Sequence, residues 1–154
     1  MMKMPTMLRT LATAGLIALT PLPAIAGAAI PDRYGQAILV YSALMALDQA
    51  NATGNYAVLR EWAAPEFQAG TTAAGLARSF AGYRRLNVAL APAVLYEPRL
   101  SAPAAIGADG ALRLAGYMPT RPLRINFDMT FREVDGRWRL IGLAVTPAPA
   151  ASAQ

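Results

Sequence analysis

Apolar and polar residues alternate most regularly near the end of the chain. Every second residue from position 123 to position 131 is apolar, and the residues between them are polar or charged. This period of two is typical of a β-strand with one buried face and one exposed face. Asp135 and Gly136 follow, a pair that a tight two-residue hairpin turn prefers. Residues 138–145 supply a returning apolar segment, so the pattern predicts a long β-hairpin.

Earlier in the chain, apolar residues recur at intervals of three and four, which is typical of amphipathic helices. A first helix is expected to begin at Pro31 or Asp32 and to end near residues 51–54. A second, short helix is expected over residues 55–64, because the following proline ends it. After a loop at 66–70, a third helix is expected from residues 71–72 to 85. The first helix should bury one face: Tyr34, Ala37, Ile38, Tyr41, Leu44 and Met45.

Between these helices and the hairpin, the sequence contains strand and turn signals. A short strand is expected at 88–90. A second is expected at 93–100, restricted to a sheet edge or a bulge by Pro92 and Pro98. Asp109 and Gly110 mark a turn before a strand at 112–118. Helices followed by strands predict an α+β fold, with three N-terminal helices packed against an antiparallel sheet.

The first 26 residues have the features of a secretory signal peptide. Lys3 and Arg9 precede an apolar stretch at 11–19, and Ala24-Ile25-Ala26 is a typical cleavage sequence. The apolar stretch is shorter than the roughly 20 residues of a transmembrane helix, and no cysteine is present to carry a lipid anchor. We therefore expect cleavage after Ala26, a periplasmic or secreted protein, and no membrane attachment afterwards. The domain is expected over residues 27–147, with a disordered Ala/Pro tail at 148–154.

Composition narrows the possible chemistry. The 154 residues include no cysteine and no histidine, and the only lysine lies in the predicted signal peptide. Histidine-dependent dehydration, thiolate chemistry and Schiff-base chemistry are therefore excluded for the mature chain. Carboxylates alone disfavour a zinc site, and no nucleotide or calcium motif is present, so neither metal nor cofactor is expected. The arginines are spread along the chain, which does not predict binding of nucleic acid.

Residues 135–141, DGRWRLI, together with the order of elements and the apolar first helix, resemble the nuclear transport factor two-like superfamily. The resemblance covers nearly all of the chain after the signal peptide. It implies a strongly curved antiparallel sheet that wraps the helices into a cone with an internal pocket. That superfamily includes isomerases, dehydratases, polyketide cyclases and exported members without an assigned activity, so the fold does not determine the function.

The sequence is compatible with three functions. The first is non-catalytic binding of a small apolar ligand or a protein partner in the cone. The second is an isomerase- or cyclase-like enzyme, with Asp48 as the base and Tyr41, on the same helix face, as the donor. The third is an interaction module that uses a face of the sheet. Asp48 also fits a solvated helix position, and aromatic residues at helical spacing also fit an ordinary core. The expected pocket residues are Tyr41, Trp62, Phe80, Phe127, Met129 and Trp138.

The hairpin supplies the reason for the third function. A two-residue turn pairs Phe131 with Leu140, and uninterrupted pairing would then place Ile141, Leu143 and Val145 on the polar face of the preceding strand. An apolar strip on that face predicts a homodimer that packs sheet to sheet. A one-residue bulge would exchange the faces of the last strand and remove this prediction.

Overall fold

The computed structural model describes residues 29–150, so the predicted signal peptide and residues 151–154 lie outside the described part. Its helices are α1 (Arg33–Thr53), α2 (Ala57–Trp62), α3 (Pro65–Gly70), α4 (Ala73–Ser79), α5 (Ala81–Arg85) and the 3-10 helix η1 (Ala91–Leu95). Its strands are β1 (Arg99–Leu100), β2 (Ala105–Ile106), β3 (Leu112–Met118), β4 (Leu123–Val134) and β5 (Arg137–Pro149). The predicted α+β class is confirmed. Between residues 29 and 150, none of the helices has the length and apolar character needed to cross a membrane.

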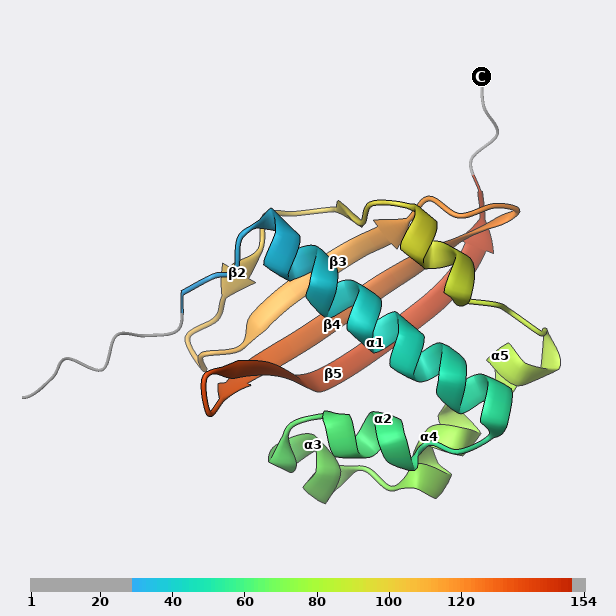
Figure 1. Cartoon of the computed structure of the whole chain (residues 1–154), viewed down its shortest axis with the longest axis horizontal. Coiled ribbons are helices and arrows are strands. Elements are labelled where there is room, and N and C mark those ends of the chain that lie inside the picture. Colours follow the sequence, from blue (N-terminus) through green and yellow to red (C-terminus); the bar gives the residue numbers. More distant parts are fainter. Residues whose placement is uncertain (1–28, 151–154) are drawn as a thin grey trace, which may run out of the picture.

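The strands form one antiparallel sheet in the order β1-β3-β4-β5, and β2 also pairs with β3. Figure 1 shows α1 lying across one face of this sheet, with α2, α3 and α4 beside the edge formed by β5. We call the face that meets α1 the inner face and the opposite one the outer face. All the described helices that pack on the sheet do so from the inner face or the β5 edge.

The hydrophobic core lies between α1 and the inner face. The buried residues of α1 are Val40, Ala43, Leu44, Leu47 and Ala50, and they meet the alternate apolar residues of β3, β4 and β5. The first two turns of α1 bury no residue. The predicted apolar face of this helix is therefore wrong in its first half, where Tyr34 and Ile38 are 81% and 56% exposed.

Two further helix predictions are wrong for local reasons. The expected loop at 66–70 is the helix α3, which has Pro65 in its first turn, where proline lacks only an N–H that a helix leaves unpaired. The backbone N–H of Ala64 donates to the carbonyl of Leu140 (2.9 Å), which holds the start of α3 against β5. The expected third helix is divided into α4 and α5 at Phe80.

The strands expected at 88–90 and 93–100 are also wrong, except for the last two residues of the second one. Residues 91–95 form η1, with Pro92 near its start. The carboxylate of Asp48 accepts hydrogen bonds from the N–H groups of Leu90 (2.8 Å) and Ala91 (3.3 Å). This side chain holds the chain in a turn where local β-propensity favours extension.

The hairpin is present, and its two-residue turn is confirmed: Asp135 and Gly136 both have positive φ, and Phe131 pairs with Leu140. After that pair the predicted register is wrong. Ile141 is an extra residue, so that Thr130 pairs with Gly142 and the faces of β5 are exchanged from that point.

The strand β5 also runs beyond its predicted end, through Pro149, so residues 148–149 are not part of a disordered tail. Ala148 pairs with Arg124, and the N–H of Ala150 donates to the Pro122 carbonyl (3.1 Å). N–H groups alternate in direction along a strand. Pro147 and Pro149 therefore occupy positions whose N–H would point away from β4, at the free edge of the sheet, where proline is tolerated.

Candidate ligand-binding cleft

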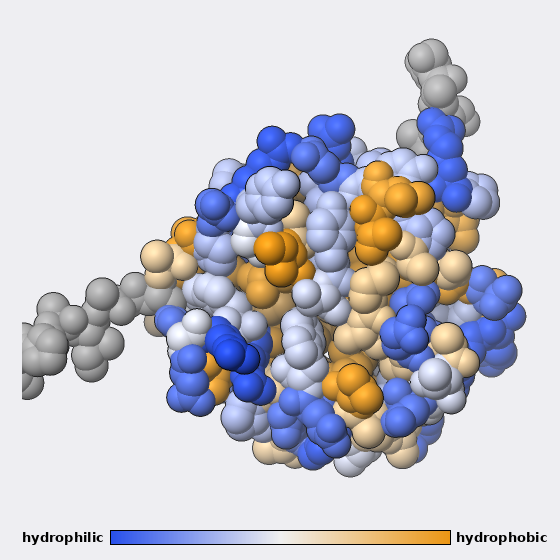
Figure 2. All heavy atoms as spheres, viewed as in Figure 1, coloured by the Kyte–Doolittle hydropathy of each residue, from blue (hydrophilic) through white to orange (hydrophobic). Residues whose placement is uncertain are grey.

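A cleft of about 640 Å³ opens between the first half of α1 and the segment 97–100. Its apolar lining comes from Ala37, Ile38 and Val40 on one side and from Pro98 and Leu100 on the other. Its polar lining comes from Arg33, Tyr34, Gln36, Tyr41, Glu97 and Arg99. Figure 2 shows apolar surface over the first half of α1 and over η1 on this side of the molecule.

The helical wall is set by the way the chain enters α1. Asp32 is the N-cap, and its Oδ1 accepts a hydrogen bond from the N–H of Gly35 (2.8 Å). The amide Nε2 of Gln36 donates to the Pro31 carbonyl (2.7 Å). A Cβ at Gly35 would lie 2.8 Å from the Pro31 Cβ, so glycine permits this tight entry. The first turn of α1 is thereby held in place although none of its residues is buried.

The opposite wall depends on the pairing of β1 with β3. Leu100 pairs with Gly116, and a Cβ at Gly116 would lie only 2.0 Å from the carbonyl oxygen of Arg99. The N–H of Ser101 extends the pairing by donating to the Ala115 carbonyl (2.9 Å). Glycine at this position therefore allows the backbone that carries Arg99 and Leu100 to approach the sheet closely.

Two contacts connect the walls. Arg33 forms an exposed ion pair with Glu97, and the hydroxyl of Tyr41 donates to the carbonyl of Tyr96 (2.8 Å). Burial raises the pKa of Tyr41, and the nearby Glu97 and Tyr34 raise it further. Tyr41 therefore stays a neutral hydrogen-bond donor at physiological pH.

The charges of the cleft do not cancel. Glu97 neutralises Arg33, whereas no described carboxylate forms an ion pair with Arg99. The lining therefore suits a ligand that has an apolar body and a single acidic group.

Asp48, the predicted base, does not line this cleft. Its Oδ1 accepts from the backbone of residues 90 and 91, and it joins α1 to the start of η1. Tyr41 donates to the same connecting segment at Tyr96. Asp48 and Tyr41, the two residues proposed for acid–base chemistry, therefore both hold residues 90–96, which lead into the cleft wall.

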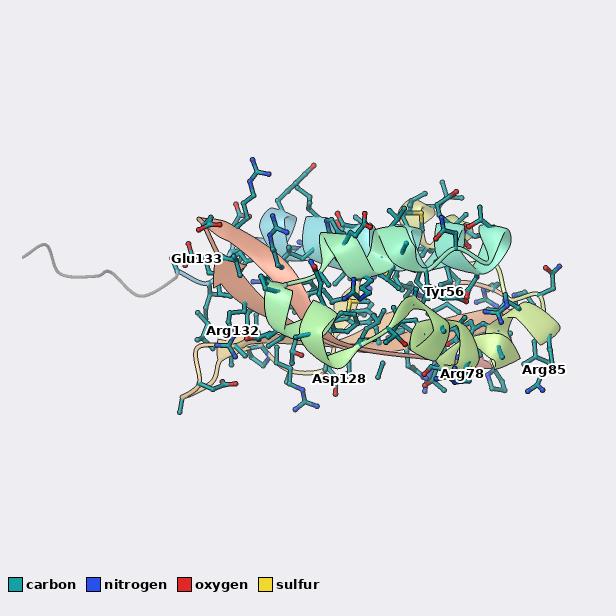
Figure 3. The ribbon with its side chains drawn as sticks, turned by 90° about the horizontal axis from the view of Figure 1, so that it is seen from below. Tyr56, Arg78, Arg85, Asp128, Arg132 and Glu133 are labelled. Carbon is teal, nitrogen blue, oxygen red and sulfur yellow. The ribbon has the colours of Figure 1, made fainter. Side chains whose placement is uncertain are left out.

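The cleft does not bring together the six residues predicted to line one pocket. Only Tyr41 lines the one described here. Phe127 and Met129 are buried in the core, while Trp62 and Trp138 pack against it partly exposed. Phe80 stacks on the buried ring of Tyr56, with centroids 6.3 Å apart. Figure 3 shows Tyr56 directed into the layer between the helices and the sheet.

The predicted interface residues are also placed differently. The extra residue Ile141 puts Leu143 opposite Met129 and Val145 opposite Phe127, on the inner face. Val145 is buried, and Leu143 packs against the core. The outer face of β5 instead carries Gly142, Ala144 and Thr146. The prediction of an apolar outer strip is therefore wrong, and the dimer loses the observation that suggested it.

Sequence reasoning did not find Arg33, Glu97, Arg99 or Leu100 as neighbours. The two walls are more than 55 residues apart in the chain, and residues 93–100 were expected to be a continuous strand. One feature of the sequence does indicate the cleft: Tyr34 and Ile38 do not fall on the helix face of the residues that α1 buries.

Comparisons with protein-family models, with curated proteins and with solved structures found nothing similar to this chain. The resemblance to the nuclear transport factor two-like superfamily remains a prediction from the sequence. Within residues 29–150, no three acidic side chains come close enough to hold a metal ion.

Proposed function

We propose that this chain is an exported, non-catalytic binding protein of the nuclear transport factor two-like kind, which holds a small amphipathic ligand in the cleft between α1 and residues 97–100. The ligand would have an aromatic or aliphatic body and one acidic group. Export follows from the predicted signal peptide, with Gly27 as the first residue of the mature protein.

The observation that supports this proposal is the composition of the cleft. Its volume of about 640 Å³ lies within the range of small-molecule sites. It places apolar side chains such as Val40 and Leu100 beside Arg99, which no described carboxylate neutralises. Binding is favoured over catalysis because Asp48 is bonded to backbone amides and leaves no carboxylate base in the lining except the ion-paired Glu97.

Fluorescence titration with 1-anilinonaphthalene-8-sulfonate, an aromatic anion, tests the proposal directly. Ile38→Glu places a negative charge in the lining, and we expect it to weaken binding of the dye about tenfold, equivalent to about 1.4 kcal/mol. Val58→Glu is the matched control, because Val58 is 62% exposed on α2 and lies outside the cleft. An equal loss in both variants, or no saturable binding to the wild type, would contradict the proposal.

A further inference from the structure

The positive charge of the described chain is concentrated in its sheet. Residues 29–98 contain five arginines and five acidic residues, whereas residues 99–150 contain seven arginines and four acidic residues. The helical part is therefore neutral, and the excess of three positive charges belongs to the sheet and its turns.

The strand register places much of this charge on the outer face. Arg124 and Arg132 alternate with the buried residues of β4, and Arg113 pairs with Thr130 beside them. Arg139 of β5 pairs with Arg132. Asp128 is the single acidic residue that β3, β4 and β5 place on this face. Figure 3 shows Asp128 on the side of the sheet opposite α1.

Two arginines of this face already bind carboxylates of the same chain. Arg113 binds Asp128 through two hydrogen bonds, of 2.9 and 2.5 Å. Arg132 donates to Glu66 of α3 (2.8 Å). The two parallel hydrogen bonds of the Arg113–Asp128 pair are the geometry in which a guanidinium group binds a carboxylate best.

Three arginines of the outer face, Arg124, Arg137 and Arg139, have no carboxylate partner among residues 29–150. Arg124 lies over the ring of Tyr117, with 5.5 Å between its Cζ and the ring centroid, and its buried Nε has no hydrogen-bond acceptor among the described residues. Arg139 faces Arg132 across the strands, and like charges in directly opposite positions repel. Both sites would be stabilised by an added negative charge.

The described helices do not lie across the outer face. On β5 it presents the small residues Gly142, Ala144 and Ala148, and the described helices lie on the inner face or beside β5. Apart from Val134 beside the turn, the paired residues of β3, β4 and β5 place no large aliphatic side chain on this face for insertion into a lipid layer, which disfavours a membrane as the partner. A second copy of the face is disfavoured by its net positive charge.

We propose that the outer face of β3, β4 and β5 docks an extended acidic segment of a partner protein. The segment would run along β4 between Arg124 and Arg132, a distance of about 26 Å for eight residues of strand. Its carboxylates would bind Arg124 and Arg139, two of the three arginines of this face that have no carboxylate partner among the described residues. This surface is separate from the cleft, so the two sites can be tested independently.

Fluorescence anisotropy with a labelled octaglutamate peptide provides the test. We expect saturable binding that weakens as salt rises from about 20 to about 200 mM, because screening acts on exposed charges. The double variant Arg124→Gln/Arg139→Gln should bind the peptide about tenfold more weakly and should retain its affinity for the anilinonaphthalene dye. The matched control is Arg78→Gln/Arg85→Gln, which removes the same charge from α4 and α5, and it should lose less than about twofold.

The proposal is overturned if both double variants lose affinity equally, since the effect would then be one of net charge. It is also overturned if octaglutamate fails to bind while vesicles containing phosphatidylglycerol do bind, or if the wild type self-associates through this face instead. Amide NMR shifts of the wild type with octaglutamate provide a reading that needs no variant. They should map to β3, β4 and β5, and a map confined to the helices would contradict the proposal.

Discussion

Gly116 connects the stability of the sheet to the shape of the cleft, and its replacement by alanine gives a sharp prediction. The new Cβ would lie 2.0 Å from the carbonyl oxygen of Arg99 and 2.9 Å from the Cα of Leu100. Both are backbone atoms, so no side-chain rotation relieves the contact. Alanine is accommodated only if β1 moves away from β3.

The cost can be estimated from the two opposing effects. Overpacking of this kind costs about 1–3 kcal/mol, and removal of a glycine from a strand returns about 0.5–1 kcal/mol. We therefore expect Gly116→Ala to lower the free energy of unfolding by about 1–2 kcal/mol. Because β1 carries Arg99 and Leu100, the affinity for the dye should fall as well.

Urea unfolding followed by circular dichroism measures the first effect, and the dye titration measures the second. Gly82→Ala is the matched control, because a Cβ at Gly82 meets no atom within 4 Å and the residue lies in α5. It should be neutral or stabilising. Wild-type stability and wild-type dye binding in Gly116→Ala would refute the close packing of β1 on β3.

Two further predictions concern the hairpin. Deletion of Ile141 removes the unpaired residue and keeps every later pair on its present face, so it should cost less than about 1 kcal/mol by urea unfolding. Deletion of Ala144 turns the inner residue Val145 outward, so it should cost about 2–3 kcal/mol. Equal losses would contradict the bulge. The second concerns Asp128, whose pKa is lowered by its hydrogen bond to Arg113. A lowered pKa in the folded state stabilises the protein above the unfolded value of about 3.9 and ceases to do so as the pH falls through the folded value. Asp128→Asn should therefore be slightly less stable than the wild type at pH 7, and this difference should shrink as the pH falls below about 3.9. A difference independent of pH would show that the ion pair is not its cause.

The α+β class and the hairpin turn were predictable because their signals are local. Alternation marks β4, and Asp135 with Gly136 adopts the positive φ angles that the turn requires. The bulge was not predictable from the pattern. After Leu140, the inner face could continue with Gly142 and Ala144, or, after a bulge, with Leu143 and Val145. Both continuations alternate, and only packing in the core selects the one that is buried.

The cleft was harder to predict because it depends on contacts between distant segments. Tyr41 was identified from helical spacing, but its partner, the Tyr96 carbonyl, belongs to a segment expected to be a strand. That segment turns into η1 because Asp48 caps it from α1. The sequence alone also allows this carboxylate to be a catalytic base, because its position on α1 does not reveal which backbone amides it meets.

The central claim is that ligand binds between α1 and residues 97–100. Amide NMR shifts recorded during titration of the wild type with 1-anilinonaphthalene-8-sulfonate test it most directly. The perturbed residues should cluster at 33–41 and 97–100. A cluster around Phe127, Met129 and Trp138 would instead place the ligand inside the fold, and it would contradict binding in the cleft.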